Sequence, residues 1–243
     1  MNKKFNTVKN QLWTIIWGIL PKRYGVQWRN FEILAKNYGQ YNSVRKNSSI
    51  DEAGNPVPWY TYPAIEYIKQ FDYSDKTVFE WGSGNSTLFW ASRSKEVISV
   101  EHNRKWFEKI NSTKPGNSRI ILAEDNEYTN AISNQGKKFD VIVIDGYMGY
   151  GRENCARLAP GLLKENGLLI LDNSDWNAES CRMLREAGFN QVDFCGFSPI
   201  NSYTLCTSLF FKDFKFTRIS DAILPIGGIK PDNTMHLADN ESV

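Results

Sequence analysis

Short apolar runs alternate with amphipathic stretches along the central part of the chain. The apolar runs predict five buried strands, at 77–81, 96–100, 119–123, 139–144 and 168–171. Apolar residues at helical spacing predict helices around and between them, at 64–68, 86–92, 103–110, 154–163 and 179–186. Two more strands are expected near 191–195 and 208–211. Strands that alternate with helices predict an α/β fold, with a mostly parallel sheet of seven strands covered by helices on both faces.

The two ends of the chain do not share this alternation. An apolar stripe at helical spacing predicts a helix near the N-terminus, formed by Phe5, Val8, Leu12, Ile15, Ile16 and Ile19. Asn, Ser, Gly and Pro residues predict a loop over 37–58. We therefore divide the chain into a basic helical N-terminal segment with its loop (1–55), an α/β domain (56–215) and a C-terminal tail (216–243).

Charge also separates the N-terminal segment from the domain. The 243 residues are 41% hydrophobic and 23% charged, as in ordinary globular proteins, and the formal net charge of +2 gives no reason to expect a nucleic-acid partner. Residues 1–50 hold nine basic residues and one acid, whereas the remaining 193 residues hold 20 basic and 26 acidic residues. This asymmetry indicates a separate role for the N-terminal segment.

Two interpretations of that role stay open. Lys residues around Trp13 and Trp17 suit an interfacial helix that contacts a membrane through residues 1–23. The same stripe suits an amphipathic helix packed on the domain, or on a second copy in a homo-oligomer. The apolar run Trp13–Leu20 is well short of the ~20 residues that cross a bilayer, and no cleavage site typical of a signal peptide follows it.

The four cysteines include no CxxC pair, and the chain has only two histidines. A zinc site is therefore not expected. We expect a reduced, cytoplasmic protein, with membrane association left open.

Acidic residues follow each of the five predicted parallel strands, where open α/β sheets bind their ligands. They are Glu80, Glu101, Asp125, Asp145 and Asp172. Gly82 and Gly84 form a G-x-G turn after the first strand, but Thr87 stands where a dinucleotide fingerprint has its third glycine. A carboxylate at Glu80 would repel a pyrophosphate and suits a cofactor that carries positive charge, such as S-adenosylmethionine.

The ordered set of these motifs resembles the class I S-adenosylmethionine-dependent methyltransferases, over roughly residues 59–211. The motifs are VFEWGSGNST, SVEHN, AED, FDVIVIDG and GLLILDNSD. The resemblance implies a Rossmann-like fold and a cofactor pocket. In that pocket, the methionine part of the cofactor lies against the first strand end, which comprises Glu80, Gly82, Ser83, Gly84 and Asn85.

The same resemblance implies that Glu101 holds the ribose, that Asp125 accepts from the adenine amino group and that His102 flanks the adenine. Tyr60, in the aromatic segment 59–63, would shield the sulfonium, because cations are attracted to ring faces. For His102 a plain surface position stays open, and for Tyr60 simple packing of the N-terminal segment on the core.

The fourth and fifth strand ends resemble metal-dependent O-methyltransferases similar to catechol O-methyltransferase. By that resemblance Asp145, Asp172 and Asn173 would bind Mg²⁺, which prefers hard oxygen ligands. The lysine of that group is replaced here by Met148. For Asp172 and Asn173, a role in a turn or helix cap is the alternative.

The form IDG…R…C also resembles bacterial methyltransferases, in which Asp145 would act as base and Arg152 would bind an anionic group of the acceptor. Tyr147 completes the catalytic candidates. Whether a metal takes part stays open.

The sequence therefore predicts methyl transfer from S-adenosylmethionine to a hydroxyl of a small molecule or glycan. A nicotinamide-dependent oxidoreductase is an alternative that Glu80 and Thr87 oppose. A second alternative is a non-catalytic scaffold of the same fold, associated with a membrane or a protein through its N-terminal segment.

Overall fold

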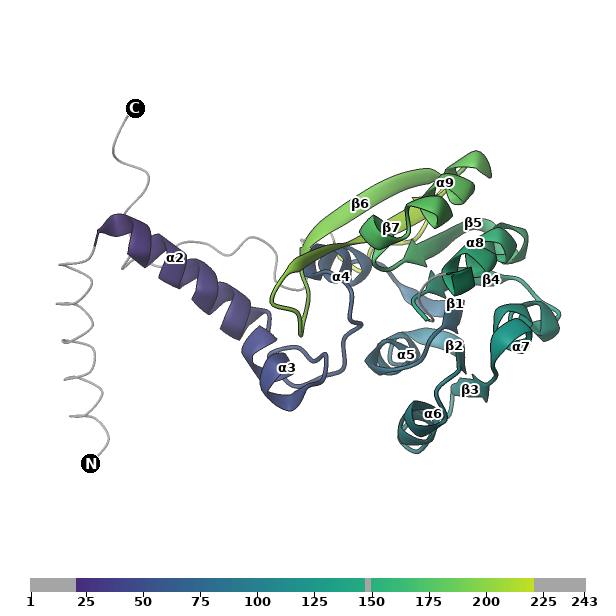
Figure 1. Ribbon diagram of the computed structural model, residues 1–243, viewed down its shortest axis with the longest axis horizontal. Coiled ribbons are helices and arrows are strands. Elements are labelled where there is room, and N and C mark those ends of the chain that lie inside the picture. The colour runs from purple at the N-terminus through teal and green to yellow at the C-terminus, as the bar shows by residue number, and fades with distance from the viewer. Residues whose placement is uncertain (1–20, 147–149, 221–243) are drawn as a thin grey trace.

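The computed structural model describes residues 21–146 and 150–220, which form a seven-stranded sheet flanked by helices (Figure 1). The strand order is β3-β2-β1-β4-β5-β7-β6. The strands are β1 (Tyr73–Trp81), β2 (Ser94–Glu101), β3 (Ser118–Leu122), β4 (Phe139–Ile144), β5 (Leu163–Leu171), β6 (Asn190–Phe197) and β7 (Thr204–Phe211). β1 to β5 are parallel, and β7 runs antiparallel to β5 and β6. The predicted fold class and all seven predicted strands are confirmed.

Helices cover both faces of the sheet. One face carries α4 (Tyr62–Ile68) and α5 (Asn85–Ala91). The other carries α7 (Asp125–Asn130), α8 (Tyr150–Leu162) and α9 (Ala178–Glu186). Further elements are α6 (Arg104–Asn111), which contacts β2 and β3, and the 3₁₀ turns η2 (Ser133–Gln135) and η3 (Ser174–Trp176).

Strand β4 shows how the sequence produces this layered core. Ile142 and Ile144 are completely buried under α7, α8 and α9, while Val141 and Val143 are completely buried under α4 and α5. Because successive side chains of a strand point to opposite faces, an unbroken apolar run is needed where both faces are covered.

The N-terminal part differs from the sequence prediction. Residues 37–58 were expected to form a loop, but a helix, α3 (Gln40–Lys46), lies within them, and it follows α2 (Lys22–Glu32) and a π-helical turn, η1 (Ile33–Asn37). Contacts with the segment that follows it stabilise this polar helix: the Ser43 hydroxyl donates to the carbonyl of Ile50 (2.7 Å) and accepts from its N–H (3.1 Å). Gly39 (φ +74°) lies against the backbone of Asp51, where a Cβ would clash.

Figure 1 shows α2 extending away from the sheet, with α3 at its inner end. The helix predicted from the apolar stripe in 1–20 lies outside the described residues. Among the described residues, no helix is long and apolar enough to cross a membrane.

The cysteines also differ from expectation. Cys195 on β6 and Cys206 on β7 are directly opposite in the antiparallel ladder and form a disulfide. Cys155 and Cys181 are free and buried. The expectation that all cysteines are reduced is therefore wrong for the β6–β7 pair, which only the fold brings together.

Candidate active site

The turn after β1 is built around Gly82. Its φ of +106° belongs to the left-handed region, and a Cβ would lie 3.2 Å from the backbone of Gly146 after β4. Only glycine suits this backbone and this close approach of two strand ends. Gly84 differs, because its φ of 166° is extended and a Cβ there would make an ordinary 3.7 Å contact with Trp106.

Thr87 has a definite role at the position where a dinucleotide fingerprint has glycine. Its hydroxyl accepts from the N–H of Gly84 (3.1 Å), which caps α5, and donates to the buried carboxylate of Glu80 (2.6 Å). Thr87 thus links the glycine turn, through Gly84, to the buried carboxyl group of Glu80.

Glu80 is completely buried at the end of β1. Its pKa is raised to about 7: burial is the main cause and the charge of Asp145 adds to the rise, whereas the hydroxyls of Ser86, Thr87 and Ser99 oppose it. A carboxyl group with this pKa exchanges its proton near neutrality, and a nearby cation would favour its charged form.

Glu101, at the end of β2, holds the adjoining loops in place. One carboxylate oxygen accepts from the N–H and hydroxyl of Ser83 (3.1 and 2.8 Å). The other accepts from the N–H groups of His102 and Asn103 (3.0 and 2.8 Å). The side chain is nearly buried yet lines the groove described next.

Two hollows lie along the carboxyl edge of the sheet and share His102. The larger, of about 860 Å³, runs over the glycine turn and the ends of β2 and β4. The smaller, of about 370 Å³, lies at the end of β3 and includes Asp125. The lining residues are Gly82, Ser83, Glu101, His102, Asn103, Lys105, Trp106, Lys109, Asp145, Gly146 and Arg152 in the larger, and His102, Glu124, Asp125, Asn126, Tyr128, Thr129, Gly151 and Asn154 in the smaller.

Two aromatic residues of these hollows escaped the sequence analysis. Trp106 donates from its indole N–H to the carbonyl of Ser83 (2.5 Å), and the side chain of Asn103 caps the helix that carries it. That cap, followed by Trp in the first helical turn, was a usable signal. Tyr128 packs its hydroxyl against Gly146, so closely that a Cβ there would overlap it. Nothing local in the sequence indicates this contact.

Arg152 is buried and joins the ends of β4 and β5. Its Nε donates to the carbonyl of Gly146 (3.1 Å), and its guanidinium also donates to the carbonyls of Asp145 and Asp172. The Asp145 carboxylate lies 3.5 Å from the same group. In the structure Arg152 thus positions the strand ends, while the anion-binding role expected from the sequence stays a prediction.

The pKa values of Asp145 and Asp172, which follow β4 and β5, are both raised. Burial raises the pKa of Asp145 to about 6; Arg152 opposes this rise and Glu101 adds to it. Burial and the charge of Asp145 raise the pKa of Asp172 well above its usual range. The Thr207 hydroxyl donates to Asp172 (2.6 Å) and accepts from the N–H of Thr61 (3.0 Å), which ties β5, β7 and the start of α4 together.

These strand ends do not suit Mg²⁺. One oxygen of Asp172 accepts from Thr207, and the guanidinium of Arg152 stands beside Asp145, where its charge opposes a second cation. Asn173 lies in a left-handed turn, and its carbonyl accepts from Asn177 (2.7 Å). In the described part of the chain, no three His, Cys, Asp or Glu side chains could share a metal ion. Tyr147 and Met148 lie outside the described residues.

Four predicted cofactor residues line neither hollow: Glu80 and Gly84, described above, and Asn85 and Tyr60. Asn85 donates to the Ser48 hydroxyl (2.9 Å) and the Ser49 carbonyl (2.7 Å), so it fastens the N-terminal segment to α5. Tyr60 is completely buried in the core under α4 and α5. Burial, and then the charges of Glu80 and Asp145, raise its pKa well above the usual value, which indicates that it lies beneath the site.

Comparison with known proteins supports the fold. No family model and no curated protein matches the chain. Among solved structures, it resembles a fibrillarin pre-rRNA processing protein of Methanococcus jannaschii (18% identity, 65% of this chain and 78% of that chain, TM-score 0.50). A precorrin-6y C5,15-methyltransferase of Geobacter metallireducens (15%, 62% and 87%, 0.48) and an rRNA methylase of Streptococcus thermophilus (14%, 62% and 96%, 0.47) also match. The chain has a Rossmann-like α/β fold, which it shares with the fibrillarin protein, and these low identities carry nothing about its activity or substrate.

Proposed function

We propose that this protein transfers a methyl group from S-adenosylmethionine to a hydroxyl of a small molecule or glycan. The observation that carries the proposal is the set of carboxyl groups at the carboxyl edge. Glu101 and Asp145 line the larger hollow together with the basic residues Lys105, Lys109 and Arg152, Asp125 lines the smaller one, and Glu80 is buried beneath the turn at Gly82. The ammonium and sulfonium groups of S-adenosylmethionine are attracted to these carboxyl groups, and a carboxylate at Glu80 opposes the pyrophosphate of a nicotinamide cofactor at the Gly82 turn.

The residues present fit this cofactor in two adjoining parts. The larger hollow, with Ser83 and Glu101, would hold the methionine and ribose parts. The smaller hollow, with Asp125 and His102, would hold the adenine. When bound, the cofactor supplies a methyl group that is electrophilic because it is attached to a positive sulfur.

Asp145 is the candidate base for the acceptor hydroxyl. With a pKa of about 6, its carboxyl group is mainly ionised at pH 7 and still basic enough to take a proton as the hydroxyl oxygen attacks. Arg152 holds the backbone on both sides of this carboxylate and so orients it. The rest of the rate enhancement in this proposal comes from positioning of the two substrates.

An exposed aromatic pair supports an acceptor with an extended apolar face, such as a sugar ring. Trp176 stands three residues after Asn173, and its ring centre lies 6.1 Å from that of Tyr203 at a tilt of 31°. Both are about half exposed. The backbone beneath them is held by hydrogen bonds from Cys206 N–H to Asp175 (3.1 Å) and from Ser174 to the Cys206 carbonyl (3.2 Å).

The first test is a calorimetric titration of the full chain with S-adenosylmethionine, with NAD in the same buffer as the control. We expect micromolar binding of S-adenosylmethionine and no signal with NAD. Binding of NAD alone would overturn the cofactor assignment. Tight cofactor binding without methyl transfer to any hydroxyl in a panel of glycosides and phenols would favour the non-catalytic scaffold.

A further inference from the structure

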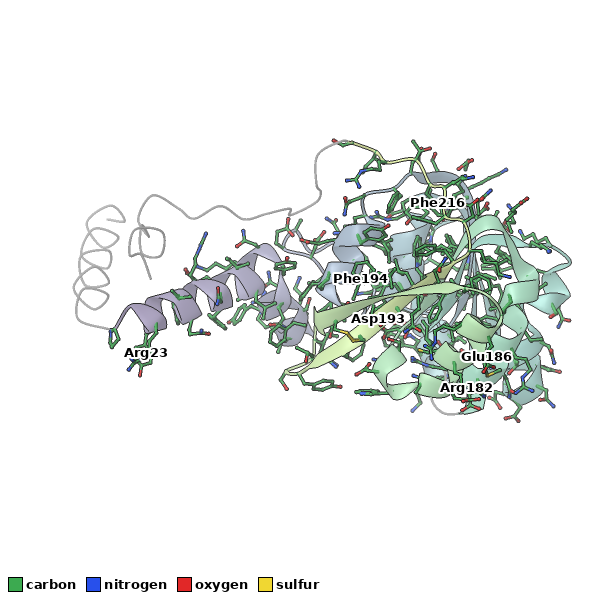
Figure 2. All side chains as sticks on the ribbon, turned by 90° about the horizontal axis from the view of Figure 1, so that it is seen from above. Arg23, Arg182, Glu186, Asp193, Phe194 and Phe216 are labelled. Carbon is green, nitrogen blue, oxygen red and sulfur yellow. A yellow bond between two sulfur atoms is a disulfide. The ribbon has the colours of Figure 1, made fainter. Side chains whose placement is uncertain are left out.

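The arm, which we define as residues 22–46, differs in charge from the rest of the protein. It comprises α2, η1 and α3, and contains six basic residues and one acid. The acid, Glu32, is paired with Lys36 one helical turn away. Figure 2 shows Arg23 at the end of α2 that lies farthest from the sheet. Since the chain beyond residue 50 has an excess of acids, the arm is a positively charged projection from a negatively charged body.

The arm also exposes large apolar side chains. Tyr24, Trp28 and Phe31 follow each other at spacings of four and three residues, so they lie along one side of α2. Tyr24 is 50% exposed and Phe31 is 54% exposed. On α3, Tyr41 and Val44 are more than half exposed at the same kind of spacing. Aromatic side chains next to basic ones are typical of helices that lie in the headgroup layer of a membrane.

The base of the arm is attached to both sides of the candidate active site. The amide of Gln40 donates to the carbonyls of Ser198 (3.0 Å) and Asn201 (3.3 Å), in the connection between β6 and β7. Ser48 and Ser49, just beyond α3, accept from Asn85 at the start of α5. A surface that binds the arm would therefore also set the orientation of the site.

We propose that the arm docks on an anionic lipid surface, with its basic side chains near the phosphates and its aromatic side chains in the headgroup layer. The charge of the arm favours this occupant over a second copy, because two arms of like charge repel each other. Exposed Phe31 and Val44 favour lipid over nucleic acid, which offers stacked bases and phosphates but no apolar layer. The proposal does not rest on the methyltransferase activity.

The test is co-sedimentation of the full chain with vesicles of phosphatidylcholine containing one quarter phosphatidylserine, and with pure phosphatidylcholine vesicles. We expect binding to the anionic vesicles that is at least tenfold tighter than to the neutral ones and that weakens with salt. Arg23→Gln with Arg29→Gln should weaken binding about 25-fold, at about fivefold per charge. Tyr24→Ser with Phe31→Ser should weaken it about tenfold or more.

The matched control is Val192→Ser with Ile219→Ser, which removes two exposed apolar side chains outside the arm and should leave vesicle binding unchanged. Circular dichroism and S-adenosylmethionine titration check that each variant is folded. The proposal would be overturned if both arm variants bound vesicles as the wild type does, or if neutral vesicles bound the protein equally well. It would also be overturned if a single-stranded oligonucleotide displaced the protein from vesicles, or if the protein formed dimers without lipid and the Tyr24 and Phe31 variant lost them.

Discussion

The carboxyl edge of the sheet and the arm are organised in opposite ways. At the edge, buried charged groups such as Glu80 and Arg152 are each held by several hydrogen bonds, and the strands beneath have apolar residues on both faces. The arm has mostly exposed side chains and is attached to the domain through a few polar contacts near Gln40 and Ser48. We therefore expect substitutions at the edge to change stability and ligand binding strongly. Substitutions in the arm should mainly change how tightly the arm binds its partner surface.

Two arginines offer the sharpest test of this difference. Arg152→Ala should lower the free energy of unfolding by about 3–5 kcal/mol, because it removes a buried charge whose partners are three carbonyls and Asp145. Arg182→Ala is the control: this side chain pairs with Glu179 and Glu186 on the surface of α9 (Figure 2), where solvent screens the pairs and their loss should change stability little. Equal losses in urea denaturation would contradict the structural role of Arg152.

The burial of Glu80 predicts a pH dependence. Because its pKa is raised from 4.5 to about 7, the folded state binds a proton more tightly than the unfolded state. Its contribution to stability is therefore greatest below about pH 4.5 and is lost as the pH rises to about 7, a change on the order of 3 kcal/mol. Glu80→Gln should remove this part of the pH dependence in denaturation curves measured between pH 4 and 8, whereas Glu96→Gln at the surface should not. Parallel curves for wild type and Glu80→Gln would refute the assignment.

Glu101 tests the cofactor site itself. Glu101→Gln should weaken S-adenosylmethionine binding by roughly 1.5–3 kcal/mol, since a charge-assisted hydrogen-bond acceptor is lost and the Ser83 turn is loosened. Isothermal titration calorimetry measures the effect, with Glu165→Gln, an exposed residue on β5 that lines neither hollow, as the control. Unchanged affinity in Glu101→Gln would remove this residue from the ribose site.

Gly82 and Gly84 belong to the same G-x-G motif, but only Gly82 has a backbone conformation that requires glycine. Gly82→Ala should cost about 1–3 kcal/mol, because alanine meets both a φ of +106° and the backbone of Gly146. Gly84→Ala should change stability by less than about 0.5 kcal/mol, because its backbone is extended and the space is sufficient. Thermal unfolding of the two variants gives the comparison, and a greater loss in Gly84→Ala would reverse our account of the turn.

A modest effect is expected where the arm joins the domain. Asn85→Ala removes two hydrogen bonds to Ser48 and Ser49 and should cost about 1 kcal/mol of stability while leaving S-adenosylmethionine affinity unchanged. Titration calorimetry and thermal unfolding of the same sample read both quantities. A large loss of cofactor affinity would restore the cofactor role that the sequence predicted for Asn85.

Strand positions could be predicted because they depend on local patterns. The run Phe139–Ile144 is bounded by polar residues and coincides with β4, and the acids that follow the strands lie at one edge because parallel strands end together. Helix α3 was missed, since its residues are polar and its stability depends on Ser43 contacting Ile50. Helix α7 was missed as well, because it is only six residues long and begins at Asp125 with a φ of +48°.

By itself, the sequence determined the α/β fold, the order of the strand-end acids and the concentration of basic charge in the N-terminal segment. These properties depend on the order of residues along the chain. Because parallel strands end at the same edge of the sheet, the acids at their ends lie near one another. The tertiary structure alone decided that Trp106 and Tyr128 close the hollows, that Arg152 holds the strand ends, that Cys195 meets Cys206, and that Asn85 holds the arm. Each of these contacts joins different segments of the chain, so its partner is set by three-dimensional packing and not by sequence spacing.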